Sequence, residues 1–190
     1  GFWSTSDHKH AHVSLIVDGT KTINYVDQRR FGTLKVIGSG VDLRRKILSL
    51  GLDLLNDENA TIEEFRARLL VGKNKSICET LMDQRILAGV GNYIKCEALY
   101  AARISPFTKT TYLKDSETFD LFHSISRIMR ASYQQGGASI RNYQQVTGEQ
   151  GEYVFSFAVY GQETDPAGRP VTKVKTLDGR TTHWVPRVQL

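Results

Sequence analysis

The chain lacks most of the features that mark secreted, membrane and metal-binding proteins. Its 190 residues include two cysteines, Cys78 and Cys96, and both fall in amphipathic segments, so we expect buried thiols in a reducing compartment. No apolar run approaches the ~20 residues that cross a bilayer, and no signal-peptide pattern opens the chain. The sequence also lacks internal repeats, a Ser-His-Asp order and a phosphate-binding glycine loop. A globular chain without an evident cofactor is what remains.

Basic residues exceed acidic ones, and the excess lies at the two ends of the chain. The formal net charge is +5. Residues 1–50 carry eight Lys and Arg against four Asp and Glu, residues 169–190 carry five against one, and residues 51–168 carry twelve against fifteen. A polyanion held between both ends would explain this pattern, and nucleic acid is the obvious candidate. Ordinary solvated surface also explains it, so charge alone does not decide.

The N-terminal part alternates apolar and polar residues and predicts a small antiparallel sheet. Strands are expected at 11–17, 21–27 and 31–38, and Asp18-Gly19 supplies the hairpin turn between the first two. Three strands leave edges and an apolar face open. We therefore expect the sheet to be the end of a domain whose first part is absent from the sequence.

The middle of the chain changes to helical periodicity. Thr61 with Glu64 forms a capping box, and Phe122, Ile125 and Met129 form an apolar stripe on the longest predicted helix. The predicted helices cover residues 41–48, 62–70, 76–84, 92–103 and 115–133.

Beyond residue 137 the pattern becomes polar and then extended. Residues 138–152 form a polar loop of a length that often has a function. Residues 154–161, 171–177 and 181–185 are expected to be strands, the last two in a C-terminal hairpin. The order of strands, helices and strands predicts an α+β fold.

The stretch DQRILAGVGNYIKCEALYAARISP, residues 83–106, is the most specific segment. It predicts a helix, a double turn and a second helix, in which Gly89 and Gly91 permit positive φ and close approach of another backbone. Asn92 is expected at the N-cap, so that N–H groups and the helix dipole point out of the turn. Such a turn binds phosphate without recognising base sequence. A plain helix corner with an Asn cap is the alternative for a GVGN motif alone.

Over its whole length this stretch closely resembles the helix-two-turn-helix segment of the formamidopyrimidine-DNA glycosylase/endonuclease VIII family. KHAHVSLIVDG with YVDQRRFGTL resembles the end of that family's N-terminal β-sandwich, and GGASIRNY, FAVYG and GRTTHWVP resemble its lesion-capping loop and C-terminal finger. The resemblance implies three parts. Residues 1–39 would end the β-sandwich, residues 40–150 would form the helix-two-turn-helix domain with the capping loop, and residues 151–190 would form the finger.

The finger matches the zincless type of that family, which builds the hairpin without metal. Zinc-binding members use two C-x-x-C pairs, and the matching positions here are Asp165, Gly168, Val185 and Val188, which cannot form a zinc site. Apolar packing is expected to replace the metal, with the following side chains: Val171, Val174, Trp184 and Val185.

The resemblance implies DNA contacts at both ends of the chain. Arg180, at the finger turn, would contact phosphates that flank a lesion, where its guanidinium matches phosphate oxygens. Arg29 and Phe31 project to one side of an extended segment. In the family they face the orphaned base and wedge into the base stack. Without the resemblance, a core Phe31 and surface arginines would be the simpler interpretation.

Other groups that could bind metal or transfer protons are assigned structural roles. His8, His10 and His12 alternate on one strand face, but no carboxylate or cysteine lies beside them to complete a metal site. Glu97 is expected to be an exposed or helix-pairing residue. The sequence therefore predicts no metal.

The resemblance implies base-excision chemistry on double-stranded DNA that contains a damaged base or an abasic site. In the family an N-terminal proline attacks the sugar, a neighbouring glutamate moves protons, and the resulting Schiff base promotes strand cleavage. This sequence begins GFWSTS, so no catalytic residue is assigned. The implied capping loop, with Ser139, Arg141 and Tyr143, would surround the flipped base.

We further expect an intracellular location, no membrane and no cofactor, and a monomer once the missing N-terminal segment of the same enzyme is present. A non-catalytic module that binds damaged or undamaged duplex DNA is the alternative. The choice between oxidised purines and pyrimidines stays open.

Overall fold

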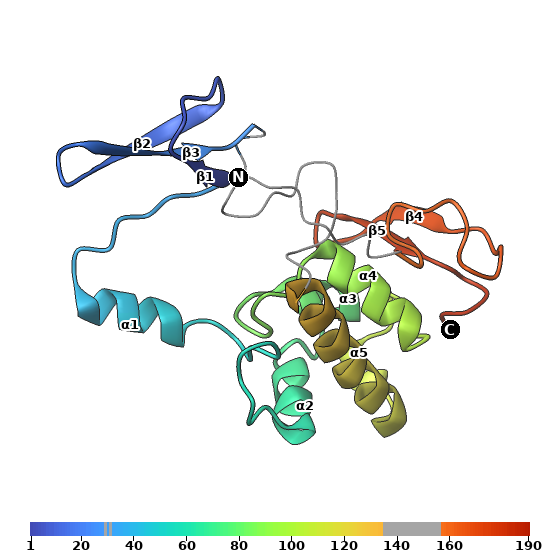
Figure 1. The fold of residues 1–190 in the computed structure, drawn as a ribbon. Coiled ribbons are helices and arrows are strands. Elements are labelled where there is room, and N and C mark those ends of the chain that lie inside the picture. Colours follow the sequence, from blue (N-terminus) through green and yellow to red (C-terminus); the bar gives the residue numbers. More distant parts are fainter. Residues whose placement is uncertain (29, 31, 135–156) are drawn as a thin grey trace. The chain divides into compact units, whose positions relative to one another are not determined.

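The computed structural model describes residues 1–28, 30, 32–134 and 157–190 (Figure 1). Contacts divide the chain into two units, residues 1–38 with 132–155 and residues 39–131 with 156–190. The first unit contains the N-terminal sheet, and the second contains the helical core and a C-terminal hairpin. Among the described helices, none is both long and apolar enough to cross a bilayer. The combination of helices and strands is the predicted α+β fold.

The N-terminal sheet has three antiparallel strands in the order β1-β3-β2. Asp18 (φ 51°) and Gly19 (φ 69°) form the predicted hairpin turn. The predicted strand at 31–38 is wrong for the described residues 32–38, which are in no strand. The edge of β3 that such a strand would have needed is taken by the first residues of the chain. The strands are β1 (Phe2–Ser4), β2 (Ala11–Val17) and β3 (Lys21–Val26).

Helices begin close to where the sequence predicts them, because polar side chains satisfy the first N–H groups. Thr61 Oγ1 accepts the N–H of Glu64 at 3.2 Å. Glu79 accepts the N–H of Ser76 at 3.1 Å in a capping box. The helices are α1 (Gly40–Leu48), α2 (Ile62–Val71), α3 (Ile77–Met82), α4 (Asn92–Ala101) and α5 (Asp115–Gln134), with a 3-10 turn η1 (Thr110–Tyr112).

The buried stripe of α5 follows the prediction with one shift. Ile125 and Met129 are buried as expected, and Leu121 and Ile128 are buried with them. Phe122 is only half-buried and contacts Phe65 of α2 edge-on, with 5.4 Å between ring centroids. The core of the second unit therefore forms between helices, where large apolar side chains interlock.

Residues 157–161 are held by a carboxylate and not by a strand partner. Glu97 on α4 is 4% exposed and accepts the backbone N–H groups of Ala158, Val159 and Tyr160 at 2.9, 2.9 and 2.8 Å. Three consecutive N–H groups that point at one side chain cannot alternate between neighbouring strands. The predicted strand at 154–161 is therefore wrong for the described residues 157–161, and so is an exposed Glu97.

The C-terminal hairpin consists of β4 (Thr172–Lys175) and β5 (Thr181–Trp184), which pair antiparallel beside α4 as predicted (Figure 1). A buried cluster of Cys96, Val159 and Val185 joins it to the helix, with Val171 and Val188 packed against the cluster. Trp184 contacts Phe107 edge-on at 5.3 Å between centroids. Val174 is half-buried. Apolar contacts thus attach the hairpin to α4 and to Phe107.

The Asp165–Gly168 turn is closed by its own carboxylate. Asp165 Oδ1 accepts the N–H groups of Ala167 at 3.0 Å and Arg169 at 2.8 Å. Its Oδ2 accepts Arg169 Nε at 2.6 Å and the Tyr100 hydroxyl at 3.1 Å. Gly168 (φ 77°) donates its N–H to Asp165 O at 2.9 Å. Among the described residues, no group of three or more His, Cys, Asp or Glu is placed to hold a metal.

The Glu97 contacts predict a stability loss for Glu97→Gln. The glutamine places an amide donor against N–H donors and removes the charge that they share, so we expect a loss of roughly 1.5–3 kcal/mol of unfolding free energy. Urea unfolding measures it. Glu163→Gln, on a carboxylate whose side chain is 93% exposed, is the control and should change stability by less than about 0.5 kcal/mol. An equal midpoint for both variants would contradict the role of Glu97.

The Asp165 turn predicts acid sensitivity of the hairpin. Burial raises the pKa of Asp165, but its hydrogen bonds from Arg169, Tyr100 and Ala167 outweigh burial and hold that pKa below its ordinary value. Such a carboxyl stabilises the fold above its unfolded pKa of about 3.9, and the contribution is lost as the pH falls through the lower folded pKa. Below about pH 4, the thermal midpoint followed by tryptophan fluorescence should fall more steeply in wild type than in Asp165→Asn.

The same midpoint at pH 7 should be unchanged by a metal chelator, because hydrogen bonds and apolar contacts hold both ends of the hairpin. A midpoint lowered by chelation would mean that a metal contributes to the finger.

Candidate nucleic-acid interface

One glutamine and one glycine fix the turn before α4. Gln84 Oε1 accepts the N–H of Gly89 at 2.9 Å, and Gln84 Nε2 donates to Val90 O at 2.9 Å. Gly89 has a φ of 79°, as predicted, and a Cβ there would lie 3.0 Å from Met129 Cε. A side chain at this position would strain the backbone, so the turn keeps a fixed direction.

The N-cap of α4 lies one residue earlier than the sequence predicts. Gly91 is the N-cap, in extended conformation (φ −106°, ψ 179°), so its predicted positive φ is wrong. Among the described residues, an added Cβ at Gly91 would meet no atom within 4 Å. Asn92 is the first helical residue and not the cap. In the part of the chain that the structure describes, no side chain caps α4, and the positive end of a helix dipole is an environment that favours anions.

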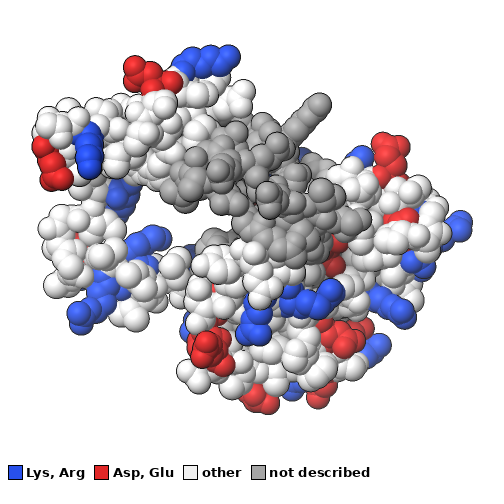
Figure 2. All heavy atoms as spheres, in the orientation of Figure 1, with Lys and Arg blue, Asp and Glu red and all other residues white. Residues whose placement is uncertain are grey.

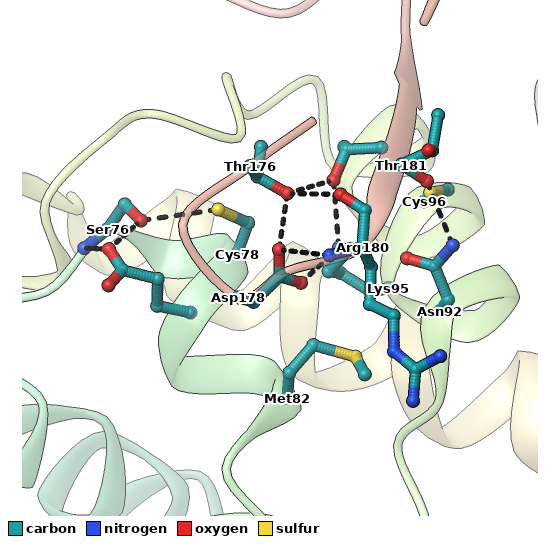
Figure 3. Close-up of polar contacts among 12 residues, drawn as sticks. Ser76, Cys78, Met82, Asn92, Lys95, Cys96, Thr176, Asp178, Arg180 and Thr181 are labelled. Carbon is teal, nitrogen blue, oxygen red and sulfur yellow. Dashed lines mark hydrogen bonds and ion pairs between the residues drawn. The ribbon is translucent and has the colours of Figure 1, made fainter. Parts of the chain in front are cut away.

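Asn92 instead faces the C-terminal hairpin. Its Nδ2 donates to the carbonyl of Thr181 at 2.9 Å (Figure 3). Thr181 follows Arg180, which is exposed and extends its guanidinium away from the neighbouring hydrogen bonds (Figure 3). Asn92 Oδ1 is buried without a hydrogen-bond partner among the described residues. The structure thus brings together two of the predicted DNA-binding side chains, at the start of α4 and at the hairpin tip.

A ring of polar side chains lies beneath this contact. Lys95 is 0% exposed, and its ammonium donates to Asp178 Oδ2 at 2.5 Å and Thr182 Oγ1 at 2.8 Å. The hydroxyls of Thr182 and Thr176 are 2.7 Å apart, and Thr176 donates to Asp178 Oδ1. If Thr182 donates to Thr176, each of the two hydroxyl protons has one acceptor. Every member of the ring then bonds to at least one other member (Figure 3).

The ring also fixes the backbone of the hairpin tip. Thr176 N donates to Arg180 O at 3.0 Å, and Gly179 (φ 78°) donates its N–H to Thr176 O at 2.9 Å. Asp178 Oδ1 lies 3.4 Å from Arg180 N and accepts its N–H. Both backbone groups of Arg180 therefore bond to members of the ring.

The two cysteines near the site are buried thiols. Both are free and buried, as predicted. Burial raises the pKa of Cys96 to about 11, and its Sγ accepts the N–H of His183 at 3.3 Å. Burial also raises the pKa of Cys78. Because the thiolate is the reactive form, burial disfavours the reactive state of both side chains.

Surface charge by itself does not mark the interface. Acidic and basic side chains are interspersed over the described surface in the view of Figure 2. Helix α1 is more strongly basic, with Arg44, Arg45 and Lys46 against Asp42. What distinguishes the candidate interface is the combination of a helix N-terminus, an amide and an exposed guanidinium.

Five predicted site residues lie outside the residues that the structure describes: Arg29, Phe31, Ser139, Arg141 and Tyr143. Their roles stay predictions.

Sequence reasoning missed Lys95 and Asp178. The available signal was spacing, since Lys95 lies three residues after Asn92 and four before Leu99, and such positions share one helix face. A lysine on a buried face requires a partner. Asp178 is the partner, and it lies 83 residues further along the chain.

Two family models match this chain. The model described as the formamidopyrimidine-DNA glycosylase H2TH domain matches residues 50–144. The model described as the formamidopyrimidine-DNA glycosylase C-terminal domain matches residues 149–190. Together they cover helices α2 to α5 and the C-terminal hairpin.

Individual relatives agree with the family models. Formamidopyrimidine-DNA glycosylases of Bradyrhizobium sp. (strain ORS 278) and Prochlorococcus marinus (strain MIT 9312) are 34% and 32% identical, over 96% and 98% of this chain. The chain spans 66% and 64% of their lengths.

Solved structures of this family also match. The MutM (Fpg) protein of Thermus thermophilus has a TM-score of 0.85 at 32% identity, over 100% of this chain and 72% of its own. Lactococcus lactis Fpg, in a complex with DNA that contains an abasic site, has a TM-score of 0.82 at 29% identity, over 99% and 70%. With its helix-two-turn-helix turn, its hairpin and these matches, the chain belongs to the formamidopyrimidine-DNA glycosylase family.

Proposed function

We propose that this chain is the DNA-binding portion of a base-excision DNA glycosylase with abasic-site lyase activity on oxidised bases. The observation that carries the proposal is the contact between Asn92 and Thr181, which places the start of α4 beside Arg180. Complexes of the related L. lactis Fpg with abasic-site DNA and with Fapy-dG DNA support the choice of ligand.

Duplex DNA would be held at this edge through its phosphates. The α4 N-terminus carries roughly half a positive charge, and Asn92 has a second N–H beside the one that it gives to Thr181. The guanidinium of Arg180 can donate two parallel N–H groups to phosphate oxygens. None of these groups contacts a base edge, so they would fix the position of the duplex without selecting sequence.

Lesion recognition would come from residues outside the described part of the chain. Arg29 and Phe31 would fill the space left by the flipped nucleotide, and the loop with Ser139, Arg141 and Tyr143 would surround the base. Unstacking a base costs a few kcal/mol, which an inserted aromatic side chain offsets. These residues are therefore proposed to supply the preference for damaged DNA.

The catalytic groups are proposed to lie on a further segment of the same enzyme. The sheet leaves Leu15 and Val17, which lie on the same face of β2, exposed to 44% and 38%. Apolar side chains of this size are more stable when covered, which supports a segment that packs there and carries the Pro-Glu pair. The 190-residue polypeptide by itself would then bind DNA without reacting.

Arg180→Ala is expected to weaken binding to an abasic-site duplex about tenfold, a change of ~1.4 kcal/mol, and to reduce the slope of log affinity against log salt by about one. Fluorescence anisotropy at several salt concentrations measures both quantities. Arg66→Ala removes the same charge from α2, where the guanidinium is paired with Asp115 at 2.7 Å, and should bind like wild type. Equal losses in both variants would mean that Arg180 acts only through overall charge.

Arg29→Ala and Phe31→Ala are expected to lower the ratio of affinities for abasic-site and undamaged duplex and to leave undamaged binding unchanged. Parallel titrations with the two duplexes give this ratio. A wild-type ratio of one would instead favour the alternative module without lesion preference.

Borohydride trapping with an abasic-site duplex is expected to give no covalent adduct on the 190-residue polypeptide, because it has no terminal proline to form a Schiff base. Denaturing gel electrophoresis detects the adduct, and a complete glycosylase of the family is the positive control. An adduct on this polypeptide would assign the amine to one of its own residues.

A further inference from the structure

The ion pair between Lys95 and Asp178 is almost fully buried, and such a pair is not expected to stabilise the fold by itself. Its side chains are 0% and 3% exposed, and the two charged atoms are 2.5 Å apart. Removing two charges from water costs so much that apolar residues in their place are often equally or more stable. We therefore ask which part of the structure the ion pair holds in place.

The geometry that the pair fixes is that of the hairpin tip. Asp178 receives the Lys95 ammonium on one oxygen, and on the other it receives the Thr176 hydroxyl and the N–H of Arg180. Thr182, which also receives Lys95, is the second residue of the return strand β5 and lies two residues after Arg180. One ammonium on α4 thus holds the hairpin on both sides of the exposed arginine.

Lys95 cannot itself bind DNA in this position. Its side chain is 0% exposed, and two of its three N–H groups already bond to Asp178 and Thr182. Asp178, with its negative charge, would repel a phosphate. Any contribution of the pair to DNA binding must therefore pass through the residues that it holds.

We propose that Lys95 and Asp178 are positioning residues for the phosphate contact of Arg180. The ion pair holds the hairpin tip against the start of α4, so that Arg180 and Asn92 meet the duplex without first being ordered. Ordering a turn on binding would reduce affinity, and a fixed turn avoids that cost. The inference rests on the proposed function, since it needs Arg180 to contact DNA.

The sign of the effect of Asp178→Asn tests the proposal. Removing an acidic charge beside bound DNA strengthens binding if charge alone matters. A positioning role predicts the opposite, a loss of about tenfold towards an abasic-site duplex, similar to the loss in Arg180→Ala. Glu163→Gln is the matched control, because it makes the same charge change on a carboxylate of the same segment that is 93% exposed, and it should not weaken binding.

Arg180→Ala combined with Asp178→Asn separates positioning from general damage. If Asp178 acts through Arg180, the double variant binds no more weakly than Arg180→Ala alone, because non-additivity marks residues that act together. A further loss in the double variant, or wild-type affinity in Asp178→Asn, overturns the proposal.

A second variant covers the case in which Asp178→Asn leaves the lysine unpaired and unfolds the hairpin. Lys95→Met with Asp178→Leu removes both charges, keeps the net charge and fills the space with apolar atoms, a replacement that folded proteins tolerate. We expect normal thermal stability with the same tenfold loss of affinity. Wild-type affinity in this variant overturns the proposal, as does unfolding of both variants at the assay temperature, which would make the pair a folding element.

The outcomes also separate this inference from the proposed function. If Arg180→Ala binds DNA with wild-type affinity, the proposed phosphate contact of Arg180 is rejected. The positioning role of Lys95 and Asp178 is rejected with it. If Arg180→Ala binds DNA weakly while Asp178→Asn and the Lys95→Met/Asp178→Leu variant both bind with wild-type affinity, the proposed function stands. Only the positioning role of Lys95 and Asp178 is then rejected.

Discussion

The attachment of the C-terminal hairpin to one face of α4 is the constraint on which the rest of the second unit depends. Asn92, Lys95, Cys96 and Tyr100 are spaced along a helix so that they share one face. Asn92 contacts the Thr181 carbonyl, and Lys95 contacts Asp178 and Thr182. Cys96 accepts the His183 N–H, and Tyr100 donates to Asp165. A single helical stripe therefore sets the position of the hairpin along its whole length, and the buried ion pair is its strongest point electrostatically.

The hairpin also shows how hydrogen bonds and packing can take over from a metal. A zinc ion would tie two turns together through four short bonds. Here each turn is closed separately. Asp165 accepts the N–H groups of its own turn, and in the second turn Gln189 accepts the N–H of Val185 at 2.7 Å and donates to Ile104 O at 2.9 Å. Val185, in the second turn, packs in a buried cluster with Cys96 of α4 and Val159. Many modest contacts thus hold the two turns, and Asp165 is also joined to α4 through the hydroxyl of Tyr100.

Prediction from sequence succeeded where the determining interactions are local. Thr61 begins α2 because its hydroxyl reaches the N–H three residues ahead, and Asp18-Gly19 turns the chain because that dipeptide tolerates positive φ. Strand predictions failed where a distant part of the chain determines which group pairs with the backbone of the segment. Residues 32–38 alternate like a strand, but β1 occupies the edge of β3. Residues 157–161 alternate too, but Glu97 takes their N–H groups. Nothing local in either segment indicates that its hydrogen bonds go elsewhere.

The features of the candidate site also separate into those that local sequence predicts and those that depend on tertiary contacts. The sequence by itself determined the GVGN turn and the hairpin with Arg180 at its tip, because both follow from residue types at short, fixed spacing. Only the tertiary structure decided that Gly91 and not Asn92 caps α4, that Asn92 bonds to the hairpin, and that Lys95 pairs with Asp178. Those contacts join residues more than 80 positions apart. Which lysine meets which carboxylate inside a protein depends on how helix and hairpin pack, and no local pattern contains that information.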